Sequence, residues 1–286
     1  AARSGAPAAS RTSSASRPLT SGLLHLVRAL RAEALKALAS PATWVGAVLA
    51  VGLPVALELY LTHDMVAQLE AGDVLALDML PEMGSAALCL STPGAIILGT
   101  TALAGEFRTG AHTTGSSRML TTTLLVAPRR GVCVAAKLVV TCLLVLTVFA
   151  IAAAATLTVT DHALGPWAPL SPFPWLRLAG AASWWLLCAL AGSALAALSR
   201  GALVPLSVLM SSMLVSPGVV LAGHTDLVRF LPDTAAWRLV ASSSALGGPR
   251  GALPQLLTVP QAFGVCAAWA VVCVVVTAVA WTGRDS

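Results

Sequence analysis

The chain has 286 residues, of which 57% are hydrophobic and only 10% charged, and its formal net charge is +5 at pH 7. Soluble domains carry about 25% charged residues, so this composition excludes a chain whose surface is solvated on all sides. Apolar runs of about 20 residues, each long enough to cross a hydrocarbon layer as a helix, indicate instead a multi-pass protein of the cell membrane.

The N-terminal part is predicted to lie in the cytosol and at the membrane surface. Residues 1–20 are rich in Ala, Ser, Arg and Pro without an acid, which predicts a disordered tail, although transit peptides have a similar composition. Residues 21–40 are predicted to form an amphipathic interfacial helix, because leucines gather on one arc and polar residues on the other. The cations of this helix, Arg28, Arg31 and Lys36, would face lipid phosphates.

Residues 41–286 are predicted to form an all-α transmembrane domain. Its six spans are expected at about 43–62, 84–104, 138–159, 178–198, 202–222 and 261–281. Kinks are expected where prolines interrupt spans, at Pro54, Pro93, Pro205 and Pro217. Small residues suit close contact between helices, among them Gly99, Ala102, Ala189, Gly192 and Ala196.

The distribution of cations predicts the orientation. With the N-terminus inside, only Arg177, Arg229, Arg238 and Arg250 of the 17 Lys and Arg residues lie outside. Cytosolic loops carry such an excess of cations, so both termini are expected in the cytosol. Of the outer segments, 160–176 reads as a short proline-stiffened loop. The segment 223–260 reads either as a helix broken at Pro232 that dips into the outer leaflet or as a capping loop.

The chemistry of common enzyme sites is missing from the sequence. Neither lysine, Lys36 or Lys137, stands in a phosphate-binding glycine loop, and metalloprotease and serine-hydrolase signatures are absent. Glu58, near the outer end of the first span, and His63-Asp64 just beyond it are expected at the aqueous interface, because no third metal ligand accompanies them. The six cysteines are expected to be packing residues. No catalytic or metal site is therefore predicted, and the chain is not expected to be an enzyme.

A polar, basic and Thr-rich stretch at 105–137 separates the second and third predicted spans. Glu106 leaves the second span, Arg108 follows, and Gly110 allows a turn. Pro128, Arg129 and Arg130 are expected to direct the chain back toward the membrane, and Lys137 marks the entry to the third span. The excess of cations in cytosolic loops explains the arginines, but it does not explain Glu106, Gly110 and Pro128 at their positions.

This pattern resembles the first cytosolic loop of bacterial ATP-binding cassette (ABC) export permeases of the type-two class. The matching residues are Glu106, Phe107, Arg108, Gly110, Leu124, Leu125, Pro128, Arg129, Arg130, Ala135, Ala136 and Lys137. The interfacial helix, the six spans, the cytosolic termini and the enlarged last outer loop also match that family's plan. Two features depart from it: Ala111 stands where the family has Thr, and the stretch from Gly110 to Pro128 is longer by several residues, with 115–118 as the insertion.

The resemblance implies a permease subunit that pairs with a second, identical or homologous permease chain and docks separate ATPase subunits. Residues of about 105–120 would form the coupling helix. The coupling residues would be Glu106, Phe107, Arg108, Gly110, Pro128, Arg129, Arg130 and Lys137. The chain itself would hold no cofactor, since ATP and Mg²⁺ belong to the partner ATPase, and it would contact membrane lipids but no nucleic acid.

The predicted cargo is an exported amphipathic compound, such as a drug, an antibiotic or a lipid-like molecule, because the spans carry almost no charge. Two other functions stay open. A membrane-embedded enzyme acting on lipid would have to use His63, Asp64, Asp161 and His162 on the outer side. A non-transporting scaffold or sensor partner of an ATPase would share the docking loop.

Overall fold

The computed structural model describes residues 18–107, 130–168, 175–215, 217–221, 226–240 and 257–283. These residues form helices and turns without a strand, which confirms the predicted helical class for this part of the chain. Five of the helical segments are long and apolar enough to cross a membrane: Pro41–Glu70, Ser85–Phe107, Gly131–Trp167, Trp175–Ser199 and Val259–Thr282. They correspond to five of the six predicted spans.

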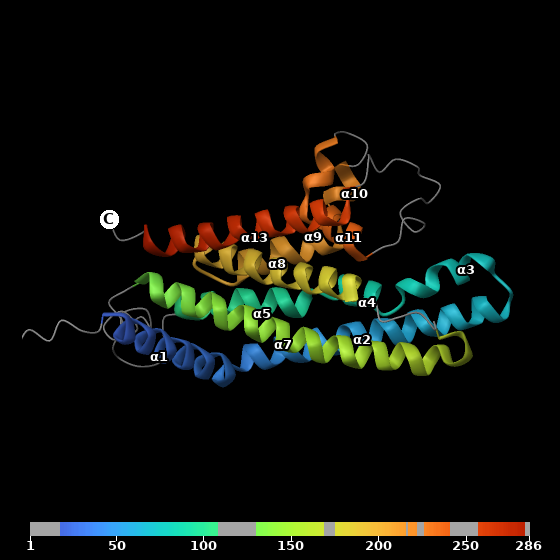
Figure 1. Ribbon diagram of the computed structural model, residues 1–286, viewed down its shortest axis with the longest axis horizontal. Helices are drawn as coiled ribbons and strands as arrows, with labels where there is room; N and C mark the ends of the chain where they lie inside the picture. The colour runs from blue at the N-terminus through green and yellow to red at the C-terminus, as the bar shows by residue number, and fades with distance from the viewer. Residues whose placement is uncertain are drawn as a thin grey trace, which may run out of the picture.

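The helix predicted over residues 21–40 is present as α1 (Pro18–Ala39), and α2 (Pro41–Glu70) follows it directly. Ser40, between them, has the extended backbone that a residue before proline prefers, and Pro41 is the first residue of α2. In Figure 1, α1 lies beside the first turns of α7 (Arg130–Leu164), near the end of the bundle that holds the C-terminus. We call this end the α1 end.

The two longest helices, α2 and α7, pack side by side along the bundle (Figure 1). They contain 30 and 35 residues, and at about 1.5 Å per residue each is longer than the roughly 30 Å of a hydrocarbon layer. Pro54 lies inside α2 without ending it. Because α7 runs to Leu164, the predicted outer loop at 160–176 begins later than expected, with a 3₁₀ turn (η3, Gly165–Trp167).

The centre of the bundle is made by α5 (Pro93–Ala104) and α8 (Trp175–Ser199), most of whose residues are buried. The two backbones approach closely at Gly99, where an added Cβ would lie 2.0 Å from the carbonyl oxygen of Ala189. The hydroxyl of Ser193 donates to the Gly99 carbonyl over 2.9 Å. The prediction that small residues permit close packing is therefore confirmed at this crossing.

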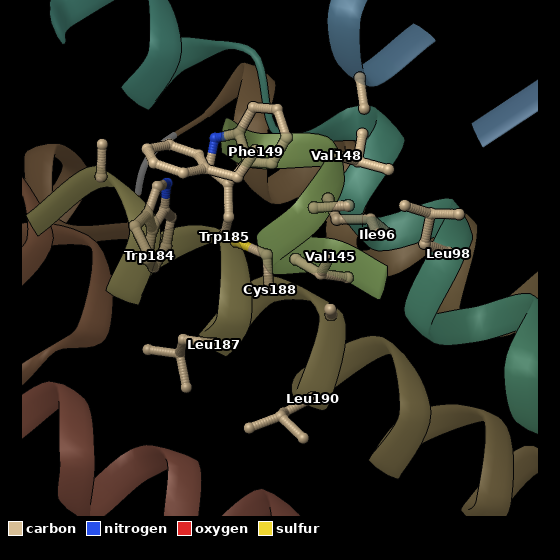
Figure 2. Packing of buried hydrophobic residues seen from close by; sticks show 14 of the residues in the cluster. Ile96, Leu98, Val145, Val148, Phe149, Trp184, Trp185, Leu187, Cys188 and Leu190 are labelled. Atoms are coloured by element: carbon tan, nitrogen blue, oxygen red, sulfur yellow. The ribbon is translucent and has the colours of Figure 1, made fainter. Parts of the chain in front are cut away.

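The second predicted span is interrupted before Pro93, where α4 (Ser85–Leu90) ends and α5 begins. Proline has no N–H, so the break frees backbone carbonyls in the interior. The indole of Trp185, which is fully buried, donates to the Leu88 carbonyl over 2.7 Å. The same ring packs edge-on against Phe149 at 5.2 Å between centroids (Figure 2). Trp185 thus provides a hydrogen-bond donor to a backbone carbonyl that lipid could not satisfy.

The predicted span 202–222 is not one long helix. It is divided into α9 (Leu203–Leu214) and α10 (Pro217–Leu221), and Ser216 lies outside the described residues. The 12 residues of α9 extend about 18 Å, which is less than a membrane crossing needs. The Thr92 hydroxyl contacts the Met213 sulfur at 3.0 Å, so α9 is joined to the break between α4 and α5.

The end of the bundle opposite the α1 end carries short helices: α3 (Val74–Met79), η1 (Leu80–Glu82), η4 (Asp226–Phe230) and α11 (Pro232–Val240). We call it the α3 end. η4 ends at Phe230 and α11 begins at Pro232, so the described part of 223–260 is helical and interrupted next to Pro232, as the broken-helix alternative expects; its depth in a membrane stays a prediction. α11 packs against α8 and α13 (Val259–Thr282), and the start of α13 is fixed by a reciprocal cap between Thr258 and Gln261.

Candidate functional site

Four charged side chains from three separate elements meet at the α1 end. Glu33 and Lys36 belong to α1, Glu106 to the 3₁₀ turn that follows α5 (η2, Gly105–Phe107), and Lys137 to α7. The Lys137 ammonium contacts both carboxylates and lies 3.1 Å from Glu106 Oε1. The Lys36 ammonium lies 3.0 Å from Glu33 Oε1 and 3.3 Å from Glu106 Oε1. We call these four residues the charge cluster.

Local structure accounts for the placement of each member. Glu33 and Lys36 are three residues apart in α1 and therefore share one face of the helix. Glu106 is the second residue after α5, which ends at Ala104. Lys137 lies two turns inside α7, where that helix packs against α1. The cluster joins the end of one apolar segment to the beginning of the next, with α1 laid across both.

The charge cluster is largely removed from solvent. Glu33, Glu106 and Lys137 are buried, whereas the Lys36 side chain is 43% exposed. Two cations face two carboxylates, so the cluster is neutral, and each buried charge has a partner of opposite sign. Removing one partner from such a group costs about 3–5 kcal/mol, because a buried charge is left uncompensated. The cluster therefore fixes how α1, η2 and α7 lie relative to one another.

The protonation of Lys36 reflects this arrangement. Burial lowers the pKa of Lys36, but the hydrogen bond to Glu33 and the charges of Glu106 and Glu33 outweigh it. The pKa of Lys36 therefore lies above its ordinary value. The other oxygen of Glu106, Oε2, is buried and has no hydrogen-bond partner among the described residues. A buried acceptor in that position is costly to leave unpaired, so the cluster retains room for one more donor.

Phe107 connects the same turn to the last helix. Its ring packs edge-on against Trp281 of α13, with 5.7 Å between the ring centroids. Neighbouring residues of η2 thus face different parts of the bundle: Glu106 faces α1 and α7, and Phe107 faces α13. A displacement of η2 would reach four helices, since η2 also continues α5.

The structure brings together some of the predicted coupling residues. Glu106, Phe107 and Lys137 lie in or beside the cluster, whereas Arg108, Gly110, Pro128 and Arg129 lie outside the described residues. Arg130 is the first residue of α7, and its side chain is not among those described. The predicted interfacial cations Arg28 and Arg31 are exposed on α1.

Sequence reasoning missed the role of Glu33. Its only signal is the spacing to Lys36, which is that of a helical ion pair. The predicted amphipathic helix has Glu33 on its polar face, and Lys36 is expected to face lipid phosphates. In the structure Glu33 is buried against α7, and Lys36 contacts carboxylates of Glu33 and Glu106 instead.

The candidate residues at the α3 end are not gathered into one site. Glu58 is fully buried, so the prediction that it reaches the aqueous interface is wrong. His63, Asp64, Asp161 and His162 are exposed. No three His, Cys, Asp or Glu side chains in the described ranges are grouped so that they could hold a metal ion. The six cysteines are free thiols, five of them buried and Cys142 half-buried, as expected for packing residues.

Comparisons of the chain with protein-family models, with curated proteins and with solved structures found no match in any of the three.

Proposed function

We propose that the chain is the permease subunit of an ABC transporter that exports an amphipathic compound, such as a drug, an antibiotic or a lipid-like molecule. In this proposal it has six spans in the cell membrane, with α9 and α10 together making the fifth in chain order across their break, and both termini are cytosolic. A second permease chain, identical or homologous, completes the pathway. Two separate ATPase subunits bind ATP and Mg²⁺.

The observation that carries the proposal is the position of Glu106. This residue begins the Glu-Phe-Arg-x-Gly pattern that resembles a coupling loop, and its carboxylate lies among Lys36, Lys137 and Glu33 where three elements meet. A subunit that pushes on the loop after Glu106 would push on α1 and α7 through this cluster. The position therefore suits a residue that passes movement from a docked subunit to the spans.

Orientation is supported by the charges at the α1 end. Arg28 and Arg31 are exposed there, next to the charge cluster. Cations near the ends of spans favour the cytosolic side of the membrane. The α1 end would then face the ATPases, and the α3 end would face outward.

The mechanism follows from the packing of η2. Closing of the ATPases around ATP would displace the loop 105–137, and the ion pairs of Glu106 together with the contact of Phe107 with Trp281 would carry the displacement into α1, α7 and α13. Such a movement is a rigid-body shift driven by contacts that differ between the ATP-bound and ATP-free states. The cargo would pass between the two permease chains.

The decisive experiment is co-purification of the tagged chain from its native membrane in mild detergent, followed by mass identification of its partners. A stoichiometric soluble subunit with a phosphate-binding glycine loop is the expected result. Recovery of the chain without an ATPase, under conditions that keep known complexes intact, would contradict the proposal. It would favour the lipid-modifying enzyme instead.

A second experiment tests the docking assignment. Arg108→Glu, in the predicted coupling loop, is expected to abolish cargo-stimulated ATPase activity of the reconstituted complex while the thermal unfolding of the chain is unchanged. Glu70→Lys, an exposed change at the last residue of α2, is the matched control. Full coupling in Arg108→Glu would remove the docking assignment, and a scaffold or sensor would show ATPase binding without cargo transport.

A further inference from the structure

A buried carboxyl group lies within α2, one of the helices long and apolar enough to cross a membrane. The Glu58 side chain is fully buried, and two polar groups from different elements lie within hydrogen-bond distance of it. The Thr160 hydroxyl of α7 lies 2.8 Å from Oε1, and the backbone N–H of Gly84, just before α4, donates to Oε2 over 3.0 Å. The group therefore joins α2, α7 and the start of α4.

The site is built closely around the Gly84 backbone. Gly84 has φ +76°, a conformation that favours glycine. An added Cβ would lie 2.9 Å from Leu157 Cδ2 and 3.1 Å from Thr160 Oγ1. A larger residue would push the amide away from Glu58, so the donor is held at the carboxyl by both the backbone conformation and the packing.

No cation among the described residues forms an ion pair with Glu58. On the neighbouring turns of α2 and α7, His63, Asp64, Asp161 and His162 are exposed. Arg177 of α8 donates to the Pro81 carbonyl. Glu82 of η1, Cys89 of α4 and Tyr60 of α2 carry no positive charge, and Lys137 of α7 belongs to the charge cluster near the other end of that helix. An ionised carboxylate without a counter-ion is very costly in a nonpolar interior, and such a group is neutralised instead.

The hydrogen-bonding pattern around Thr160 is complete only if Glu58 carries a proton. A hydroxyl carries a single hydrogen, yet two acceptors lie within reach of Thr160 Oγ1: Glu58 Oε1 at 2.8 Å and the Thr156 carbonyl at 3.0 Å. With a proton on Oε1, Glu58 donates to Thr160, Thr160 donates to Thr156, and Gly84 donates to Oε2. Every hydrogen of the group is then used, and no charge is left in the interior.

We propose that Glu58 is a proton-binding site whose carboxyl stays protonated at neutral pH and donates that proton to the Thr160 hydroxyl. The proton remains bound as long as α2, α7 and the start of α4 stay packed together. Water entering between these elements at the α3 end would release it, since a hydrated carboxyl ionises at neutral pH. The inference stands on this geometry and does not depend on the proposed transport function.

Infrared spectroscopy of the purified chain in lipid nanodiscs tests the proposal. We expect a carboxylic acid C=O band at neutral pH that shifts to higher frequency in Thr160→Val, because the hydrogen-bond acceptor is lost. Thr160→Ser keeps the hydroxyl and is expected to keep the band in place. Thr158→Val is the matched control, since Thr158 is exposed on the same helix and bonds only its own helix, at the Ala154 carbonyl.

Glu58→Gln should remove the band altogether, whereas Glu70→Gln, at an exposed site, should leave it. Absence of an acid band that responds to Thr160→Val would overturn the proposal. It would mean that Glu58 is an ionised carboxylate. If Glu58→Gln fails to fold, the wild type and the two Thr160 variants decide the question alone.

Discussion

Lys137 and Glu106 are 31 positions apart in the chain, yet the Lys137 ammonium lies 3.1 Å from Glu106 Oε1, with both side chains buried. The contact joins the last turn of one apolar segment to the first turns of the next. Because Glu33 of α1 contacts the same ammonium, the pair also holds α1 against the bundle.

Replacing Lys137 should destabilise the fold strongly. Lys137→Met leaves Glu33 and Glu106 buried side by side with only the half-exposed Lys36 to compensate them. We expect the free energy of unfolding in detergent to fall by about 3–5 kcal/mol. Arg31→Met, an exposed change on α1, should leave it within about 0.5 kcal/mol. Equal effects of the two variants would mean that the charge cluster contributes nothing to stability.

The alkaline stability of the protein should depend on Lys36. Its pKa is raised in the folded state, so its contribution is complete at pH values below the ordinary 10.5 and is lost as the pH rises through the folded value. Wild type is therefore expected to lose more stability than Lys36→Met between pH 9 and about 11 in urea unfolding. The difference should be at most about 1 kcal/mol, because the partly exposed ammonium is screened by solvent. Parallel curves for the two proteins would contradict this.

Adding one methyl group at Gly99 should separate α5 from α8. In Gly99→Ala the new Cβ would lie 2.0 Å from the Ala189 carbonyl oxygen, so the helices must move apart. A loss of about 1–3 kcal/mol or more is expected in thermal or urea unfolding. Gly52→Ala in α2 is the control, since a Cβ there meets nothing within 4 Å. A helical alanine without a clash should be neutral or slightly stabilising. A tolerated Gly99→Ala would show that this crossing is looser than described.

Removing the indole N–H of Trp185 should destabilise the fold. Trp185→Phe keeps an aromatic ring near Phe149 but leaves the Leu88 carbonyl without its donor. An unpaired buried acceptor costs about 1–3 kcal/mol, and we expect that loss in unfolding experiments. Trp175→Phe, at an exposed ring, should change stability by less than about 0.5 kcal/mol. If both variants behave alike, the carbonyl has found another partner.

Glu106 shows how the structure changes the design of a functional test. From the motif alone, reversing the charge of Glu106 tests docking to an ATPase. In the structure a lysine at this place would stand beside Lys36 and Lys137 in a buried site, and the variant would lose stability for that reason alone. Arg108 is therefore the better position for the docking test.

The helical class, the five long apolar helices, the helix at α1 and the interruptions next to Pro93 and Pro232 could all be predicted from the sequence. Each rests on a local property: the length of an apolar run, the spacing of leucines, or a proline that has no N–H. The kink expected at Pro217 lies where α10 begins, but the end of α9 at Leu214 could not be predicted. In that segment composition indicated apolar residues but did not show that the helix stops at Leu214.

The partners of the charged residues were decided by the tertiary structure. Glu33 has the spacing of an ion pair with Lys36. Its contact with Lys137 spans 104 positions, and the sequence near either residue does not predict that contact. Glu58 stands near the end of an apolar run, where exposure is the usual outcome. It is buried because α7 and the start of α4 bring Thr160 and Gly84 to its carboxyl. The length of an apolar run and the position of a proline affect neighbouring residues, so the sequence by itself determines most of the helices. The pairing of polar groups depends on which helices pack together, and the tertiary structure decides that.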